Sequence, residues 1–474
     1  MDSNCRLDHL CQRLMSWLAG VYGLLTALLV FVVSRRTRNN GRICDVASFK
    51  FTSTSTSDVI FPLNATTPNN MFTSEQAEIS LTITGDPIQV WASIDSYHKC
   101  NYQIDVPDIP TRAYAIKGSN NSPSKIRMIQ GSTNFHPMTG PSLFNVTRSC
   151  DVYWNKTANP DPVMYAANEF LDSTFAFGNE TVISLCHTEY PGNRYDNCPT
   201  GPKSYPYCWT VSVGLMISYD YGTTWQHARP PPQHLVAAVP YQYIASQRAS
   251  GWGDPTNIVY HHEDGYYYVA MWNRNPVGLQ PPGICMMRTQ SLLEPSSWRG
   301  WNGSHFSVSF ASPYNNRLVD KEEAWNVSDH ICTVLDVEES TLDQTQCSPF
   351  GLVWSSELKV FLMTWGCLSG YGSFYMTTSS DLIHWSLNPP HPFYNASLLP
   401  PDVSKLVTSL HYPSIMDATA PATFADNNYF TIGNNPHLFW VSFGHNVYLD
   451  GSSVFATPIR IQRGKDEIIA PMEK

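Results

Sequence analysis

The sequence predicts an all-β fold, and three observations support this class. Its 474 residues are 42% hydrophobic and 13% aromatic but only 14% charged, a composition that suits a large buried core rather than a disordered chain or a coiled coil. From about Asp105 onward, short runs of aromatic and β-branched residues alternate with turn residues, and no helical period is visible. Hairpin-like units of one kind also recur along this region.

The first element is an apolar run, Leu14–Val33, of twenty residues without a charge. This length matches the ~20 residues that cross a bilayer as a helix. We expect a short cytoplasmic tail at 1–13 and a transmembrane signal-anchor at 14–34, with a cleaved signal peptide as the alternative. Four arginines follow the run and two precede it, which by the positive-inside rule favours a cytoplasmic C-terminal side.

Cysteines and glycosylation sequons favour the opposite orientation. Ten of the 12 cysteines lie beyond the apolar run, and an even set of this kind is typical of disulfides formed in an oxidising compartment. Eight N-x-S/T sequons also lie beyond it. We therefore predict a single-pass type II membrane protein whose large, N-glycosylated domain is lumenal or extracellular. The pairing of the cysteines stays open.

The net charge of the chain bears on whether it can bind nucleic acid. The formal net charge is −10, and no basic stripe is available to neutralise phosphates, which excludes a nucleic-acid partner. Residues 35–101 contain the polar stretches TSTSTSD and PLNATTPNN, typical of a stalk or linker. Two apolar pieces at its end, AEISLTI and IQVWASI, are candidates for extra strands.

A turn motif stands at Met216–Ala228, MISYDYGTTWQHA. It follows the pattern S-x-D-x-G-x-T-W, in which Asp220 can accept backbone N–H bonds and Gly222 can supply a positive φ. Trp225 then returns on the next strand and packs beneath. The pattern resembles the Asp-box of sialidase-like β-propellers, so we expect Asp220 to stabilise a turn and not to take part in chemistry.

Degenerate relatives of this unit end at Trp298 and Trp385, each after its own strand hairpin. Similar units stand at the front of the region and at the C-terminus, which makes five. Five hairpin-rich units predict a five-bladed β-propeller over residues 102–474, preceded by the single transmembrane helix and the polar stalk.

The region Asp105–Arg463 resembles the five-bladed propeller glycoside hydrolases of the arabinanase, xylosidase and invertase group, and a set of uncharacterised secreted proteins of the same plan. The segments that carry this resemblance are DVPDIPTRAYAIKG, HPMTGPSL, CHTEYPG, SYPYCWT, GDPTNIVYHHEDGYYYVAMWNRNP, MMRTQSLLEPSSWRGWNG and SLHYPSIMD.

The resemblance implies carboxylates at the mouth of a central channel, because cleaving a glycosidic bond needs one protonated and one ionised carboxyl. Asp108 is similar to the first-blade Asp of the group, with Asp105 as a nearby competitor, and Asp254 is similar to its mid-chain Asp. Glu189 is the expected proton donor, although it precedes Asp254, the reverse of the family order.

Seven further residues are expected to bind substrate, and each also has a structural alternative. Aromatic side chains in a propeller commonly pack between blades, and polar ones commonly brace turns or bridge blades. These seven are Arg112, His187, Tyr190, Trp252, Asn257, Arg274 and Asp417. No zinc spacing, phosphate loop or nucleophile elbow is present, so we expect no cofactor and no catalytic metal.

Three functions follow from these observations. The first is a membrane-anchored glycosidase acting on polysaccharide or glycan. The second is a non-catalytic, lectin-like propeller, which the reversed order of Glu189 and Asp254 favours. The third is a sialidase, which needs three arginines around the substrate carboxylate, with Arg112, Arg248, Arg274 and Arg288 as the inner candidates.

Overall fold

The computed structural model describes residues 38–39, 42–43, 79–92, 112–116, 125–130, 136–148, 153–154, 158–198, 206–314, 326–338, 346–367, 372–387, 391–405, 407, 409–443 and 452–463. The chain forms two compact units, Met1–Glu75 and Gln76–Lys474. In the first unit, β1 (Arg38–Asn39) pairs antiparallel with β2 (Arg42–Ile43). The run expected to span a membrane lies outside the described residues, and none of the helices within them is long and apolar enough to cross a bilayer.

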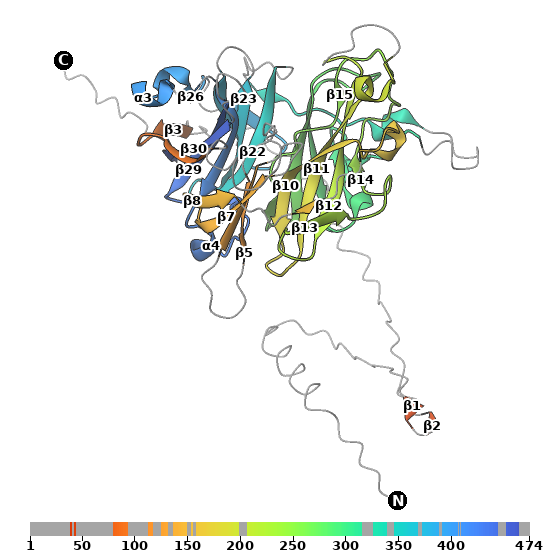
Figure 1. Ribbon diagram of the computed structural model, residues 1–474, viewed down its shortest axis with the longest axis horizontal. Helices are drawn as coiled ribbons and strands as arrows, with labels where there is room; N and C mark the ends of the chain where they lie inside the picture. Colours follow the sequence, from red (N-terminus) through yellow and green to blue (C-terminus); the bar gives the residue numbers. More distant parts are fainter. Residues whose placement is uncertain are drawn as a thin grey trace, which may run out of the picture. The chain divides into compact units, whose positions relative to one another are not determined.

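The second unit has an all-β, propeller-like fold whose described strands form five sheets (Figure 1). Sheet 1 contains β5 (Arg112–Ile116), β6 (Lys125–Gln130), β7 (His136–Ser142) and β8 (Asn145–Arg148). Sheet 2 contains β9 (Tyr153–Trp154), β10 (Asn168–Ala176), β11 (Val182–Pro191), β12 (Trp209–Ser218), β13 (Thr224–His227), β14 (Leu235–Ala237) and β15 (Ser250–Gly251).

The other three sheets follow along the chain. Sheet 3 contains β16 (Val259–His261), β17 (Tyr266–Asn273), β18 (Gly283–Thr289), β19 (Arg299–Trp301) and β20 (Phe306–Ser309). Sheet 4 contains β21 (Val337–Glu338), β22 (Cys347–Ser355), β23 (Val360–Cys367), β24 (Ser373–Ser379), β25 (Trp385–Leu387), β26 (Tyr394–Asn395) and β28 (Thr431–Ile432). Sheet 5 contains β27 (His411–Asp417), β29 (Pro436–Phe443), β30 (Ser452–Arg463), β3 (Ile79–Ile83) and β4 (Ile88–Ala92).

Helical segments in the described residues are short and lie between strands. They are η1 (Pro162–Met164), η2 (Gly192–Tyr195), η3 (Pro295–Ser297), η5 (Val327–His330), η6 (Ala396–Leu398), α3 (Pro401–Ser404) and α4 (Ala420–Thr423). Proline at the first or second position of η1, η3, α3 and α4 is favourable there, because the missing N–H is not needed in a first turn.

Each sheet contacts the next one in the chain. β5 and β6 lie against β10, β15 lies against β17, β17 lies against β22, and β22 lies against β27. The fifth sheet contacts the first, because β4 lies against β8. The segments AEISLTI and IQVWASI contain β3 and β4, and both strands pair antiparallel with β30 near the C-terminus. Strands from the two ends of the second unit thus complete one sheet.

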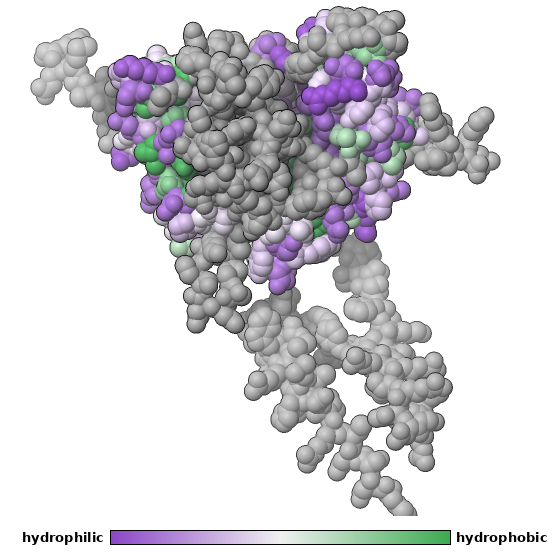
Figure 2. Space-filling model, in the orientation of Figure 1, coloured by the Kyte–Doolittle hydropathy of each residue, from purple (hydrophilic) through white to green (hydrophobic). Residues whose placement is uncertain are grey.

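The core lies between these sheets. The largest cluster of buried residues joins sheets 2, 3 and 4 and includes Leu215, Met271 and Met363, all fully buried. Large exposed hydrophobic side chains are few and lie apart in the sequence, and Figure 2 shows mainly hydrophilic or intermediate residues on the described surface of the viewed face. Burial of this kind contributes about 1.5–3 kcal/mol per large aliphatic side chain.

Three disulfides within the described residues confirm the expectation of disulfide bonds. Cys347–Cys367 joins residues directly opposite each other on β22 and β23, and Cys285–Cys332 ties β18 to a later loop. Cys198–Cys208 closes the connection between β11 and β12. Such bonds are typical of domains that fold in an oxidising compartment.

The turn around Asp220 joins β12 to β13. The carboxylate Oδ1 of Asp220 accepts from the backbone N–H of Thr223 (3.0 Å) and of Thr224 (2.8 Å), and Gly222 has a φ of 78°. The indole N–H of the buried Trp225 donates to the Gly222 carbonyl at 3.0 Å. These hydrogen bonds offset the raising effect of partial burial, and they lower the pKa of Asp220. The side chain therefore stabilises the turn.

Candidate functional site

A cavity of about 470 Å³ is lined by residues of sheets 2, 3, 4 and 5. Five aromatic rings line it from different strands: Phe170 on β10, Trp209 on β12, Trp272 on β17, Phe350 on β22 and Tyr412 on β27. Its charged or titratable lining residues are His187, Glu189, Arg194, Asp254 and Arg274. A concave site with aromatic walls and a few convergent polar groups is the usual form of a small-ligand pocket.

Strand β11 supplies His187 and Glu189, two of the cavity's polar side chains. Residues two apart on a strand point to the same face, so both side chains reach the cavity while Thr188 points to the opposite face of sheet 2. His187 is paired across the ladder with Phe170, which also lines the cavity. The two-residue period of the strand therefore places both polar side chains on the cavity face of sheet 2.

Asp254 reaches His187 from the loop between β15 and β16. Its φ is 46°, in the left-handed region that non-glycine residues rarely adopt, and the following Pro255 disfavours helical backbone as well. A Cβ added at Gly253 would lie 3.1 Å from a ring carbon of His187 and 2.7 Å from Val211, so glycine permits this close approach. Backbone strain held in place by close packing is found most often at functional sites.

His187 lies between two carboxylates. Its Nδ1 is 2.9 Å from Oδ1 of Asp254, its Nε2 is 3.5 Å from Oε1 of Glu189, and its side chain is 11% exposed. Burial disfavours the charged imidazole, but the charges and hydrogen bonds of Asp254 and Glu189 outweigh this cost and raise the pKa of His187 well above its ordinary value. We therefore expect an imidazolium at neutral pH.

Two groups of Asp254, its backbone N–H and its carboxylate, compete for Nδ1 of His187, and the protonation of that nitrogen decides between them. The backbone N–H of Asp254 lies 3.1 Å from the same Nδ1, and it can donate there only when that nitrogen carries no proton. A protonated Nδ1 donates instead to Oδ1 of Asp254. The raised pKa of His187 favours the second arrangement, in which the imidazolium donates to Asp254.

Asp172 is a further carboxylate near this site that the sequence analysis did not single out. It is fully buried on β10 at the point where the register with β11 shifts, between Leu171 and Ser173. A β-bulge of this kind re-aims a side chain. Oxygen or nitrogen atoms of Asp172, His187 and Asp254 lie within 4.8 Å of one another, a spacing that could hold a cation. An acidic residue inside the apolar stretch NEFLDSTFA was the available sequence signal.

Several residues expected to bind substrate do not line the cavity. The Tyr190 hydroxyl donates to the Pro160 carbonyl and accepts from Asn197, both at 3.0 Å, on the other face of β11. Trp252 is fully buried in the core. Asn257 exchanges two hydrogen bonds with the backbone of Leu352 and so joins sheet 3 to sheet 4.

Asp417 also has a structural environment. It is fully buried at the end of β27, where Oδ1 accepts from the Thr419 backbone and hydroxyl and Oδ2 accepts from the Gly433 backbone at 2.9 Å. Asp108, together with its competitor Asp105, lies outside the described residues. Arg112 is the first residue of β5, and its side chain is not among those described.

Two arginines, Arg194 and Arg274, line the cavity among the described residues. Arg288 lies elsewhere, with its guanidinium carbon 4.0 Å from the centre of the Tyr266 ring, and it pairs with Asp264 at 3.4 Å. Arg248 lies over the Tyr207 ring. The sequence analysis did not single out Arg194, Trp209, Phe350 or Tyr412, because nothing in an isolated loop or strand shows which face meets a distant sheet.

Comparison with known proteins gives a likeness only to solved structures. No family model and no curated protein matches the chain. The α-L-arabinofuranosidase of Podospora anserina, solved with cellotriose, is 9% identical with a TM-score of 0.39, over 81% of this chain and 98% of that one. The Lactobacillus brevis α-L-arabinofuranosidase is 9% identical with a TM-score of 0.41, over 74% and 92%.

An N-acetylgalactosamine deacetylase from F. plautii, solved with blood group B trisaccharide, is 10% identical with a TM-score of 0.41, over 80% of this chain and 95% of that one. These two activities differ, and the similarity is low in every case. The likenesses therefore carry no conclusion about the chemistry of this chain, which has to be argued from its own residues.

Proposed function

We propose that this protein is a glycoside hydrolase-like enzyme that acts on a polysaccharide or glycan in the cavity of sheets 2 to 5. The observation that carries the proposal is His187, which brings the carboxylates of Asp254 and Glu189 together at one aromatic-walled cavity. Aromatic rings suit the apolar faces of sugars, and the charged groups suit their hydroxyls.

The spacing of the two carboxylates fits this chemistry. Both oxygens touch the two nitrogens of a single imidazole, at 2.9 and 3.5 Å. They therefore lie at most about 9 Å apart, below the upper limit of about 9.5 Å for the carboxyl pair of an inverting glycosidase. A shorter separation, which this bound permits, would suit a retaining enzyme.

Each carboxyl is assigned a role from its place beside His187. Asp254, whose Oδ1 is 2.9 Å from Nδ1, serves as the base that activates the attacking water, or as the nucleophile. Glu189, whose Oε1 is 3.5 Å from Nε2, protonates the glycosidic oxygen as the attacking oxygen bonds to the anomeric carbon and the glycosidic bond breaks. His187 is a positioning residue for both. Asp108, outside the described residues, stays a predicted catalytic carboxylate.

The proposed fold is a five-bladed propeller in which each of the five sheets is one blade. The cyclic order of contacts between sheets supports this count, because the fifth sheet contacts the first through β4 and β8. A cavity lined by four of the five sheets is the arrangement expected where blades surround a common axis.

The proposed location is lumenal or extracellular, with residues 14–34 as the membrane anchor. Three disulfides within the described residues support an oxidising compartment. N-glycosylation belongs to the same proposal. Five of the eight sequon asparagines, Asn145, Asn179, Asn302, Asn326 and Asn395, lie in the described part of the chain.

A non-catalytic, lectin-like function is the second candidate. The observation that favours it is that one imidazole engages both carboxylates, which would leave neither group free to exchange a proton with substrate. The same aromatic walls would then hold a glycan without cleaving it. A sialidase function has less support, because two arginines and not three line the cavity among the described residues.

Turnover and binding measured on the same preparation separate these candidates. The full chain is assayed on a panel of aryl glycosides and polysaccharides, beside Glu189→Gln, Asp254→Asn and the control Asp264→Asn, whose carboxylate lies away from the cavity. We expect the first two variants to lose at least about 100-fold in kcat, and the control to keep its rate. Sugar binding without turnover would support the lectin, and neither binding nor turnover would overturn both candidates.

A further inference from the structure

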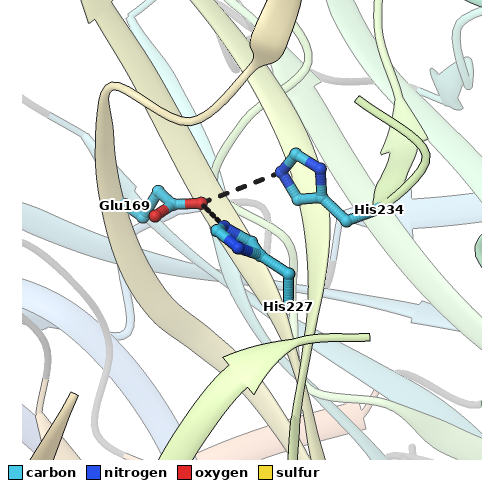
Figure 3. A group of neighbouring side chains, drawn as sticks. All are labelled: Glu169, His227 and His234. Atoms are coloured by element: carbon cyan, nitrogen blue, oxygen red, sulfur yellow. Dashed lines mark hydrogen bonds and ion pairs between the residues drawn. The ribbon is translucent and has the colours of Figure 1, made fainter. Parts of the chain in front are cut away.

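A second cluster of titratable side chains lies away from the cavity, in the interior of sheet 2. It consists of Glu169 on β10, His227 on β13 and His234, which precedes β14 (Figure 3). Glu169 pairs across the ladder with Thr188, the residue that points away from the cavity face. The cluster therefore occupies the opposite face of the sheet from His187 and takes no part in the proposed chemistry.

The three side chains converge on one point. Nε2 of His227 is 2.7 Å from Oε1 of Glu169, and Nε2 of His234 is 3.8 Å from the same oxygen, as Figure 3 shows. Ligands of a tetrahedral Zn²⁺ at 2.0–2.1 Å from the metal are about 3.3 Å apart, so each distance needs a change of only about half an ångström. Two histidines and one glutamate form a ligand set that zinc uses in proteins.

Protein groups alone leave part of this cluster unsatisfied. The Glu169 side chain is 1% exposed, and within the described residues its Oε2 has no hydrogen-bond partner. His234 is fully buried, and its Nδ1 likewise has none. A buried carboxylate oxygen without a donor costs free energy, and a cation held by both oxygens of Glu169 would reduce that cost.

The imidazole of His234 also has a backbone neighbour. Its Nε2 lies 3.1 Å from the Tyr165 carbonyl, to which it can donate a proton when no metal is bound. Binding a metal through Nε2 would move that proton to Nδ1 and cost this hydrogen bond.

The backbone around the cluster makes room for the His234 ring. A Cβ at Gly214 would lie 2.8 Å from Cδ2 of His234, so β12 needs glycine beside this ring. The side chain of His227 is 14% exposed, whereas those of Glu169 and His234 are buried.

We propose that Glu169, His227 and His234 form a three-residue binding site for one Zn²⁺ ion, which ties β10 to β13 and to the segment before β14. Zn²⁺ suits this ligand set better than Ca²⁺ or Mg²⁺, which prefer oxygen donors. A redox-inactive ion also suits a chain that forms disulfides.

Metal content tests the proposal on the full chain. After dialysis in metal-free buffer, the protein is titrated with ZnCl2 and followed by calorimetry and elemental analysis, and its Tm is measured with and without a chelator. We expect one Zn²⁺ per chain, a lower Tm after chelation, and recovery of Tm when Zn²⁺ is returned. If the wild-type chain binds no Zn²⁺, the proposal is wrong, whatever the variants do.

Variants locate the ion. Glu169→Gln and His234→Gln should weaken Zn²⁺ binding by more than the about 10- to 100-fold typical of losing an outer-shell partner. Asp264→Asn is the matched control, because Asp264 also pairs with a histidine, His261, at 3.1 Å. Zn²⁺ binding that survives Glu169→Gln but is lost in Asp254→Asn would place the ion at the cavity and overturn the assignment. Co²⁺ bound in place of Zn²⁺ gives a second measurement. Its visible spectrum in the wild-type protein should be that of a tetrahedral site with nitrogen and oxygen ligands.

Discussion

His187 connects the electrostatics of the cavity to the stability of the fold. Its folded pKa is raised by Asp254 and Glu189, so the stabilisation it contributes is fully present below its unfolded pKa of about 6.5 and is lost as pH rises through the folded pKa. His187→Gln should therefore destabilise the protein most at about pH 6 and progressively less at alkaline pH. Denaturant unfolding of both proteins across this range measures the difference.

The control for this measurement is His262→Gln, since His262 is an exposed histidine next to Tyr260. Its free energy of unfolding relative to wild type should vary much less over the same range. A difference between wild type and His187→Gln that grows with pH would show that the ring is neutral in the folded protein. The Asp254 backbone N–H would then be the partner of Nδ1.

Asp254 carries both a carboxylate and a strained backbone. At φ 46° an alanine suffers the same steric conflict as other residues with a Cβ, whereas glycine does not. We expect Asp254→Gly to be about 1 kcal/mol more stable than Asp254→Ala, with both variants inactive. Thermal unfolding of the two variants tests this. Equal stabilities would mean that the left-handed backbone is not kept in solution.

Four residues that the sequence analysis named for the site, His187, Glu189, Asp254 and Arg274, line the cavity. Glu189 and Asp254 were named from the resemblance to propeller glycoside hydrolases, and the roles of all four residues stay predictions. The meeting of His187 with Asp254 is a contact across 67 residues of sequence, set by a loop conformation that no local pattern reveals. Trp252 was expected to bind substrate as an aromatic side chain, but it is fully buried in the core, the structural alternative.

At the scale of single elements, a second turn has the same hydrogen bonds as the Asp220 turn, although its sequence matches the motif only in part. The turn between β24 and β25 lacks both the glycine and the threonine of the Asp220 turn. Oδ1 of Asp381 nevertheless accepts from the backbone of Ile383 and His384, at 2.9 and 2.8 Å, and the Trp385 indole donates to the Leu382 carbonyl at 3.0 Å. Leu382 takes the positive φ, 67°, that glycine takes in the other turn.

The two turns should respond alike to loss of the carboxylate. Asp220→Ala and Asp381→Ala each remove an oxygen that accepts two backbone N–H bonds, and we expect each to cost about 1–3 kcal/mol of unfolding free energy. Asp→Asn at either position keeps an acceptor and should cost less. Chemical denaturation measures all four. If Asp381→Ala leaves the free energy of unfolding unchanged, the buried Trp385 alone is enough to stabilise its turn.

At the scale of the whole molecule, composition and recurring hairpins were sufficient to predict an all-β, propeller-like fold, because both depend on local sequence. The closure of sheet 5 was harder to predict. β3 and β4 were visible only as short apolar pieces at the end of a polar stretch, and their partner β30 is more than 360 residues away. Pairing over such a distance leaves no periodic signal in either segment.

Because β3 and β4 complete sheet 5, we expect two N-terminal truncations to differ in their effect on thermal stability. Removing residues 1–75 should leave the Tm of the second unit unchanged, because the compact unit begins at Gln76. Removing residues 1–93 also deletes β3 and β4, which uncovers Ile459 and Ile461 on β30 and breaks the contact of β4 with β8. Burying an isoleucine side chain is worth about 1.5–3 kcal/mol, so exposing both should lower stability by about 3–6 kcal/mol, roughly twice the cost of a single turn variant above. Thermal unfolding of both truncated chains checks this, and equal Tm values would show that sheet 5 does not depend on its N-terminal strands.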